Sequence, residues 1–122
     1  MFYALFIALG LLAGIARAAH DAQSFTPGCL ARWGQFWDNR TSWLNKYKSR
    51  DATAGPAFPG ATTWLVALTD GWHLSNLAAW AAADAAVLWA AWGSPKWWWA
   101  VGYVLARRVV FEPVYSRLRK LA

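Results

Sequence analysis

Long apolar runs alternate with polar segments along the chain, which has 122 residues. The first run covers about residues 1–19, the second about 61–92, and the third 97–122, where it passes into a basic end. A tight turn, Gly-Ser-Pro-Lys at 93–96, separates the last two runs. A membrane-spanning helix needs about 20 predominantly apolar residues. The pattern therefore predicts an all-α integral membrane protein, with three transmembrane helices in a single membrane domain.

The second run is longer than a bilayer requires. As one helix, residues 61–92 would measure about 48 Å, whereas the hydrocarbon core is about 30 Å thick. We expect such a helix either to tilt and protrude into the interface or to kink near Gly71.

The first run has two interpretations. Its apolar length and the small residues on either side of Arg17 are typical of a secretory signal peptide. It lacks the positively charged start of such peptides, so we favour a membrane helix that is retained. Gly10 and Gly14 form a G-x-x-x-G pattern, which allows a second helix to approach closely. We therefore predict that these glycines take part in helix packing.

Residues 20–60 form the polar part of the chain. Within 30–48, aromatic residues and leucines recur at helical spacing with basic residues between them, which predicts an amphipathic helical segment in the headgroup layer. Asp38 and Asn39 are expected to divide it into two short helices, and prolines and glycines predict a loop over 49–60. Candidate ligands for anionic headgroups are Arg32, Arg40, Lys46, Lys48 and Arg50.

Composition supports a membrane location. Hydrophobic residues make up 58% of the chain, whereas they make up roughly 45–50% of soluble domains. Charged residues make up 15% of the chain, whereas they make up about a quarter of soluble domains. The net charge of +6 suits anionic lipid. A nucleic-acid-binding protein would concentrate this charge on a polar domain, so we expect no nucleic-acid partner. A single cysteine, Cys29, excludes an internal disulfide and a cysteine-based zinc site, and we predict no metal site.

Basic residues set the expected orientation. Six lie within 17–60 and five at the C-terminal end, but only Lys96 lies in the turn between the last two runs. With the N-terminus outside, both basic regions face the cytoplasm, as the positive-inside rule requires. We therefore expect a protein of the bacterial inner (cytoplasmic) membrane with an external N-terminus and a cytoplasmic C-terminus.

The second run carries ionisable residues that are costly inside a membrane. Asp70, His73 and Asp84 are spaced so that they share one helix face, which should point toward protein rather than lipid. If the last two spans form an antiparallel hairpin, each acid lies level with basic residues of the third span. The expected intramembrane ion pairs join Asp84 to Arg107 or Arg108, and Asp70 to Arg117 or Arg119.

Two roles are open for Asp70 and His73. They either lock the register of the hairpin, as buried pairs can do, or belong to a functional site. The functional alternative adds Asp21 and Lys46 as catalytic candidates, with an acid–base pair acting on a lipid headgroup and the lysine holding its phosphate. We expect no cofactor; the alternative is a b-type haem held by His20 and His73, the two histidines of the chain.

Short motifs in the first half of the chain carry a resemblance. W-L-N-K-Y-K at 43–48 is followed by F-P-G-A-T-T-W-L-V at 58–66 and T-D-G-W-H-L at 69–74. The combination, over about 14–75, resembles an uncharacterised family of small bacterial polytopic membrane proteins. The resemblance implies a membrane-embedded protein and brings no activity with it. It points to eight residues: Asp21, Asn45, Lys46, Gly60, Thr63, Asp70, Trp72 and His73.

The sequence as a whole predicts a small membrane protein without catalytic activity. Small size, the glycine pair and the lack of a complete catalytic motif favour an accessory or structural subunit. Its expected partners are anionic lipid headgroups and either other membrane protein subunits or further copies of itself. The alternative is a membrane-embedded enzyme that acts on a lipid or lipid-linked substrate through an Asp/His site at the cytoplasmic interface.

Overall fold

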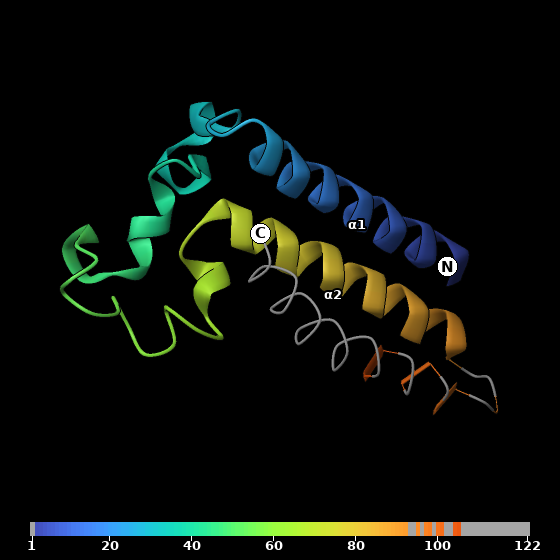
Figure 1. Ribbon diagram of the computed structural model, residues 1–122. Coiled ribbons are helices and arrows are strands. Elements are labelled where there is room, and N and C mark those ends of the chain that lie inside the picture. Colours follow the sequence, from blue (N-terminus) through green and yellow to red (C-terminus); the bar gives the residue numbers. More distant parts are fainter. Residues whose placement is uncertain (1, 93–94, 96, 99, 102–103, 106–122) are drawn as a thin grey trace, which may run out of the picture.

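Two antiparallel helices and the segment that joins them make up most of the described chain. Helix α1 spans Phe2–Phe25 and helix α2 spans Gly71–Ala91. Figure 1 shows the helices side by side, with the connecting segment, residues 26–70, at one end of the pair. In the part that the structure describes, every named element is helical, which confirms the predicted all-α class. This computed structural model describes residues 2–92, 95, 97–98, 100–101 and 104–105.

Helix α1 is longer than the first predicted span. Its sequence meets no helix breaker before Pro27 and Gly28, where proline removes an N–H donor and Gly28 adopts a φ of 83°. The helix therefore ends at Phe25 instead of near residue 19. As a result, His20 and Asp21 lie within the last turns of α1.

Helix α2 begins at Gly71 instead of residue 61, so the prediction of one helix over 61–92 is wrong at its start. Residues 61–70 form turns and a short 3-10 helix, η5 (Val66–Leu68). Asp70 then caps α2, because its side chain accepts a hydrogen bond from the His73 N–H. At 21 residues, α2 is roughly 32 Å long, so spanning a bilayer requires neither a large tilt nor a kink.

One helix of the described chain, α2, has the length and apolar composition to cross a membrane. The third predicted span, 97–122, and the turn at 93–96 lie largely outside the described residues. Residues 97–98, 100–101 and 104–105 are described and helical. The predicted basic partners of the hairpin lie outside the described residues: Arg107, Arg108, Arg117 and Arg119.

Small side chains dominate the contact between α1 and α2. Ala16 of α1 is buried, as are three alanines of α2: Ala79, Ala82 and Ala86. Alanines at a helix interface allow the two backbones to approach closely. The large apolar side chains of α1 are placed differently, and five of them are exposed: Leu5, Ile7, Leu11, Leu12 and Ile15. Much of the apolar surface of α1 therefore lies outside the helix pair.

The connecting segment consists of tight turns where the sequence predicted amphipathic helices. Before residue 51 it contains four 3-10 helices: η1 (Ala31–Trp33), η2 (Gln35–Trp37), η3 (Ser42–Lys46) and η4 (Lys48–Arg50). The break expected at Asp38 and Asn39 is present between η2 and η3. The helix type was predicted incorrectly, because Gly34, at a φ of 108°, ends η1 after one turn.

Candidate functional site

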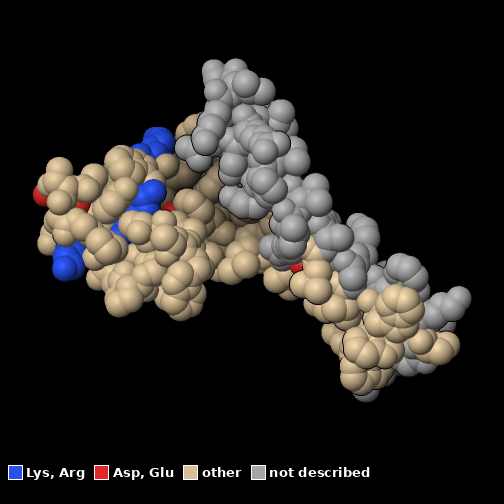
Figure 2. All heavy atoms as spheres, turned by 60° about the horizontal axis from the view of Figure 1, so that its bottom comes forward, with Lys and Arg blue, Asp and Glu red and all other residues tan. Residues whose placement is uncertain are grey.

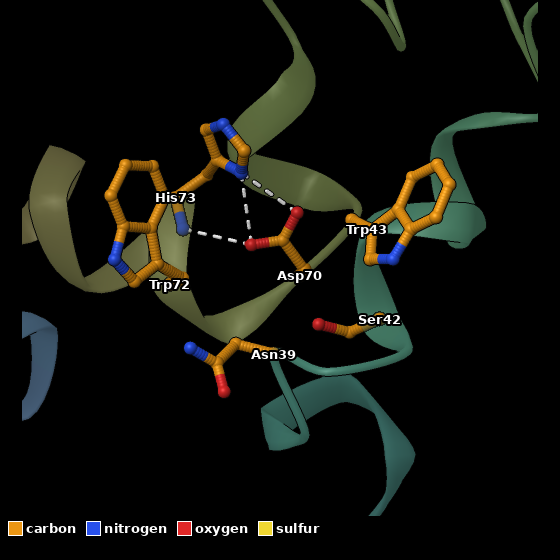
Figure 3. Close-up of a pocket in the computed structure, with 6 residues that line it drawn as sticks. All are labelled: Asn39, Ser42, Trp43, Asp70, Trp72 and His73. Atoms are coloured by element: carbon orange, nitrogen blue, oxygen red, sulfur yellow. Dashed lines mark hydrogen bonds and ion pairs between the residues drawn. The ribbon is translucent and has the colours of Figure 1, made fainter. Parts of the chain in front are cut away.

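Asp70 and His73 form a hydrogen-bonded pair at the start of α2. The Asp70 carboxylate, in a residue only 2% exposed, accepts from the His73 backbone N–H at 2.9 Å. Nδ1 of the imidazole lies 2.9 and 2.8 Å from the two carboxylate oxygens (Figure 3). Thr69 Oγ1 donates to the same carboxylate at 3.2 Å. The N–H and the imidazole belong to the same residue, the third of the helix. The N-cap hydrogen bond therefore also places the imidazole against the carboxylate.

The charge state of Asp70 follows from these contacts. Burial raises the pKa of its carboxyl, but the hydrogen bonds from the His73 imidazole and N–H, with the His73 charge and the Thr69 hydroxyl, lower the pKa below its usual 3.8. Asp70 is therefore a carboxylate at neutral pH. When Nδ1 donates to it, a neutral His73 keeps its lone pair on Nε2. Such a pair can orient a general base or hold a helix end in place.

A second acid–imidazole pair lies at the end of α1. His20 Nδ1 is 3.1 Å from Asp21 Oδ1, and the other Asp21 oxygen accepts from Arg17 Nε at 3.0 Å. The sequence indicated Asp21 as a catalytic candidate together with Asp70, but it did not indicate that each acid has its own histidine.

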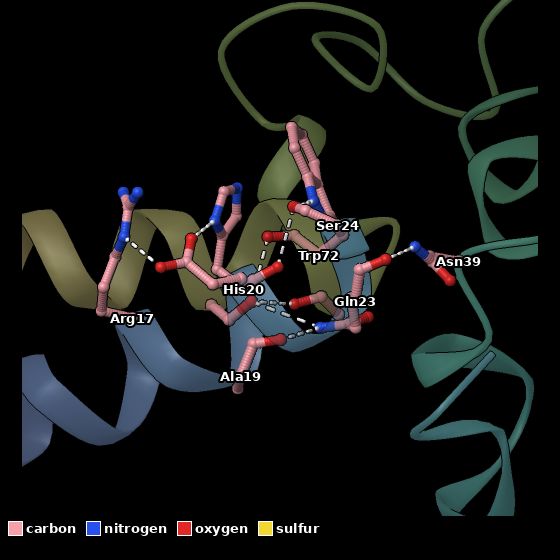
Figure 4. Close-up of polar contacts among 10 residues, drawn as sticks. Arg17, Ala19, His20, Gln23, Ser24, Asn39 and Trp72 are labelled. Carbon is pink, nitrogen blue, oxygen red and sulfur yellow. Dashed lines mark hydrogen bonds and ion pairs between the residues drawn. The ribbon is translucent and has the colours of Figure 1, made fainter. Parts of the chain in front are cut away.

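Trp72 connects the two pairs across the helix interface. Its ring centroid lies 4.6 Å from that of His20 and 4.8 Å from that of His73. Its Nε1 donates to Ser24 Oγ on α1 at 2.8 Å (Figure 4). Haem ligation by His20 and His73 stays an alternative prediction. The described residues contain no group of three or more potential metal ligands.

The four catalytic candidates of the sequence fall into three separate sets of contacts. Asp70 and His73 hold each other, while Asp21 is engaged by Arg17 and its neighbouring histidine. The Lys46 ammonium lies 5.4 Å from the centroid of the Tyr47 ring. The structure therefore joins Asp70 directly to His73 alone among the four, and a catalytic role for the set stays a prediction.

A polar network that sequence reasoning missed joins α1 to α2 and to the connecting segment. Gln23 is fully buried on α1, and its side chain donates to Ser75 Oγ of α2 at 3.5 Å. Its backbone carbonyl accepts from Asn39 Nδ2 of the connecting segment (Figure 4). Asn39 Oδ1 in turn accepts from the Gly28 N–H at 2.9 Å. The glutamine near the end of an apolar helix was the signal available in the sequence.

Residues that carry the family resemblance shape the approach to Asp70. Asn45 Nδ2 donates to the Thr69 carbonyl at 2.8 Å, which fixes the residue before the cap. Gly60 adopts a φ of 85°, and its carbonyl accepts from Thr63 Oγ1 at 3.4 Å. These contacts hold the loop that leads into α2.

A pocket of about 130 Å³ opens beside the Asp70–His73 pair. Six residues line it: Asn39, Ser42, Trp43, Asp70, Trp72 and His73. Ser42 is 1% exposed, and its Oγ has no hydrogen-bond partner. Figure 3 shows this hydroxyl directed toward the space between Asn39 and Asp70. Nothing in the sequence marked Ser42, because its burial depends on contacts between the connecting segment and α2.

Basic side chains gather over the connecting segment, as Figure 2 shows for the described residues. The Arg32 guanidinium lies 5.7 Å from the centroid of the Trp33 ring. Arg40 Nε is 2.7 Å from Asp38, an ion pair at the surface. Of the predicted headgroup ligands, Arg40 thus has a carboxylate partner, and Lys46 and Arg32 each lie over an aromatic ring.

Together these features define a helical protein with one helix suited to a membrane and a polar site at the base of that helix. No family model matches the chain, and no curated protein or solved structure matches it. The family resemblance therefore stays a prediction.

Proposed function

We propose that this chain is a small integral membrane protein that acts without catalysis, as an accessory or structural subunit packed against other membrane helices. The observation that carries the proposal is the surface of α1. Alanines make the contact with α2, while Ile7, Leu11 and Ile15 are 59%, 62% and 68% exposed. Burying one such side chain is worth about 1.5–3 kcal/mol, so a row of them in water would be unfavourable. Contact with lipid or with another helix would remove these side chains from water.

We propose that α1 spans the membrane beside α2, the helix whose length and composition suit a span. Helix α1 has no charged residue before Arg17, and its 24 residues extend roughly 36 Å. It lies antiparallel to α2, so the C-terminal end of α1 and the start of α2 are at the same end of the pair (Figure 1). At that end, Trp33, Trp43 and Trp64 are exposed, as in an aromatic belt. With a third span over 97–122, the positive-inside rule gives an external N-terminus in a bacterial inner membrane.

Cys29 tests this orientation without any substitution. It is the single cysteine of the chain, and it is exposed in the connecting segment. A membrane-impermeant maleimide should label it in inverted membrane vesicles from bacteria that express the protein, and should leave it unlabelled in intact spheroplasts. Labelling in spheroplasts would show the opposite orientation. Extraction of the protein by alkaline carbonate would contradict membrane residence itself.

A face of α1 defined by Gly10 and Gly14 is suited to helix packing. Ile7 and Leu11 share this face by their spacing, and both are exposed. A Cβ added at either glycine meets no atom within 4 Å. The glycines therefore leave a shallow groove that α2 does not occupy. Helix pairs in membranes use such small-residue grooves for close approach.

Replacing Gly14 with leucine should block this contact and leave the helix pair intact. The space beside Gly14 is open, so the new side chain disturbs nothing within the described chain. We expect association with a second copy, measured by energy transfer between labelled proteins in lipid vesicles, to weaken at least about tenfold, which corresponds to roughly 1.4 kcal/mol.

Ala8→Leu is the matched control, because Ala8 is also exposed on α1 but lies on a different face. It should associate as the native chain does. Equal association of Gly14→Leu and Ala8→Leu would show that the glycine face does not pack against a second copy. Partners other than the chain itself would then be sought by crosslinking from the same face.

The alternative function, an enzyme acting on a lipid or lipid-linked substrate, draws on the Asp70–His73 pair beside its pocket. In the structure Asp70 is engaged by the helix cap and by His73. Asp21 and Lys46 have other partners. These contacts favour a structural role for the pair, and hence the non-enzymatic function.

A further inference from the structure

The Ser42 hydroxyl is the polar group of the site that the fold leaves unused. It is 1% exposed, yet its Oγ has no hydrogen-bond partner, while the neighbouring Asn39 and Asp70 are both engaged. A buried hydroxyl without a partner is unfavourable, so its presence requires a reason. The pocket supplies one, because Ser42 lines it and its hydroxyl is directed into it.

The walls of the pocket favour a small cation. The ionised Asp70 gives the site negative charge, and the indoles of Trp43 and Trp72 line it. A cation over an indole face is attracted by the ring quadrupole. Ser42 Oγ offers a lone pair as hydrogen-bond acceptor. A volume of about 130 Å³ suits a group the size of ethanolamine and is too small for an acyl chain.

An anion would be the obvious ligand for the start of α2, because helix N-termini attract negative charge. Here the Asp70 carboxylate already occupies that position: it accepts from the His73 N–H and carries the negative charge itself. A second anion in the same pocket would be repelled. The charge of the site therefore opposes phosphate and favours an amine.

We propose that this pocket binds a primary ammonium group, which donates a hydrogen bond to Ser42 Oγ and lies against Trp43 and Trp72 beside Asp70. Two sources carry this chemistry: the ethanolamine headgroup of a phospholipid and a soluble amine. Arg50 favours the headgroup, because its Nη2 donates to the carbonyl of Thr41, the residue before Ser42, and so brings a cation near the site that can attract a lipid phosphate. The headgroup source rests on the membrane residence proposed above, whereas the ammonium site does not.

The test uses the full chain in detergent micelles. Short-chain phosphatidylethanolamine, phosphatidylcholine and phosphatidylglycerol are added in turn, and bound lipid is measured by native mass spectrometry. Free ethanolamine is titrated separately and followed by NMR. Ser42→Ala removes the acceptor without filling the pocket. Thr62→Ala, which removes an exposed hydroxyl elsewhere in the connecting segment, is the control.

Phosphatidylethanolamine should bind more tightly than the other two lipids, because a quaternary ammonium cannot donate a hydrogen bond and a glycerol headgroup has no cation. Ser42→Ala should weaken its binding about tenfold, the loss of one hydrogen bond to a charged group. Thr62→Ala should bind as the native chain does. Without ligand, Ser42→Ala should unfold no more easily than the native protein, since it removes an unpaired group.

The outcomes distinguish a soluble amine from a lipid headgroup, and they test the ammonium site separately from membrane residence. Ethanolamine binding that depends on Ser42 supports the site with a soluble ligand, and binding of the lipid alone supports the headgroup. Equal binding of all three lipids, or equal affinity of Ser42→Ala and the native chain, would overturn the ammonium site. The Cys29 labelling and carbonate extraction report membrane residence independently of these measurements.

Discussion

Replacing Asp70 with alanine should destabilise the protein by about 2–4 kcal/mol, the largest effect we expect from a single polar substitution. Loss of an N-cap costs about 0.5–2 kcal/mol. The part-buried His73 imidazole would also lose its acceptor, which adds about 1–3 kcal/mol, whereas Thr69 Oγ1 keeps the Val66 carbonyl at 2.7 Å. The measurement is denaturant unfolding of the full chain in detergent, followed by tryptophan fluorescence and far-UV circular dichroism.

Asp70→Asn is the matched control because asparagine is as good an N-cap as aspartate. It should retain most of the stability and lose only the charge. The pKa of Asp70 lies below 3.8 in the folded chain, so its contribution is present above about pH 4 and is lost as the pH falls through the folded pKa. The stability difference between native protein and Asp70→Asn should therefore shrink below pH 4.

The same variants separate the structural role from catalysis. If Asp70 and His73 only fix the start of α2, a cellular defect in Asp70→Asn or His73→Asn should follow the loss of stability or assembly. A variant that folds and assembles as the native chain does, yet has lost its cellular effect, would contradict the structural role. If Asp70→Asn is instead unfolded at neutral pH, then the negative charge of Asp70, and not its N-cap hydrogen bond, provides most of its stabilisation.

The sequence predicted the apolar helices from composition but not where α2 begins. Residues 61–70 are as apolar as the helix that follows, so hydrophobicity places no boundary there. The boundary comes from one local interaction, the Asp70 carboxylate accepting from the His73 N–H. From the sequence, Asp70 and His73 are two ionisable residues three positions apart within a predicted membrane span. The capping geometry of Asp70 explains why a carboxylate is tolerated at this point.

The remainder of the site depends on contacts between residues distant in sequence. Asn39 reaches the Gln23 carbonyl, and Asn45 reaches the Thr69 carbonyl, across turns whose course the sequence did not reveal. Side chains recurring at helical spacing suggested helices in the connecting segment, but short 3-10 turns can present residues at a similar spacing. The pocket at Ser42 arises from the way these turns pack on α2, so residue type alone could not indicate it.

Gly71→Ala should destabilise the protein by about 1–2 kcal/mol, although alanine normally favours a helix. Gly71 begins α2, and an added Cβ would lie 2.7 Å from Cδ2 of Trp37 on η2. Alanine gains at most about 1 kcal/mol in helix propensity over glycine. Overpacking costs about 1–3 kcal/mol, and the clash involves Cε3, Cδ2 and Cζ3 along one side of the indole's six-membered ring, so the indole has to move as a whole. Steric conflict therefore outweighs propensity.

Gly10→Ala provides the control, because the space beside Gly10 is open and propensity acts alone there. It should stabilise the protein by up to about 1 kcal/mol in the same unfolding measurement. In a Trp37→Leu background the conflict disappears, so Gly71→Ala should become neutral or stabilising, and the double-mutant cycle gives the coupling energy. If Gly71→Ala stabilises the native chain as Gly10→Ala does, η2 does not rest on the start of α2. The pocket beside Asp70 would then lack the support that this packing gives its wall.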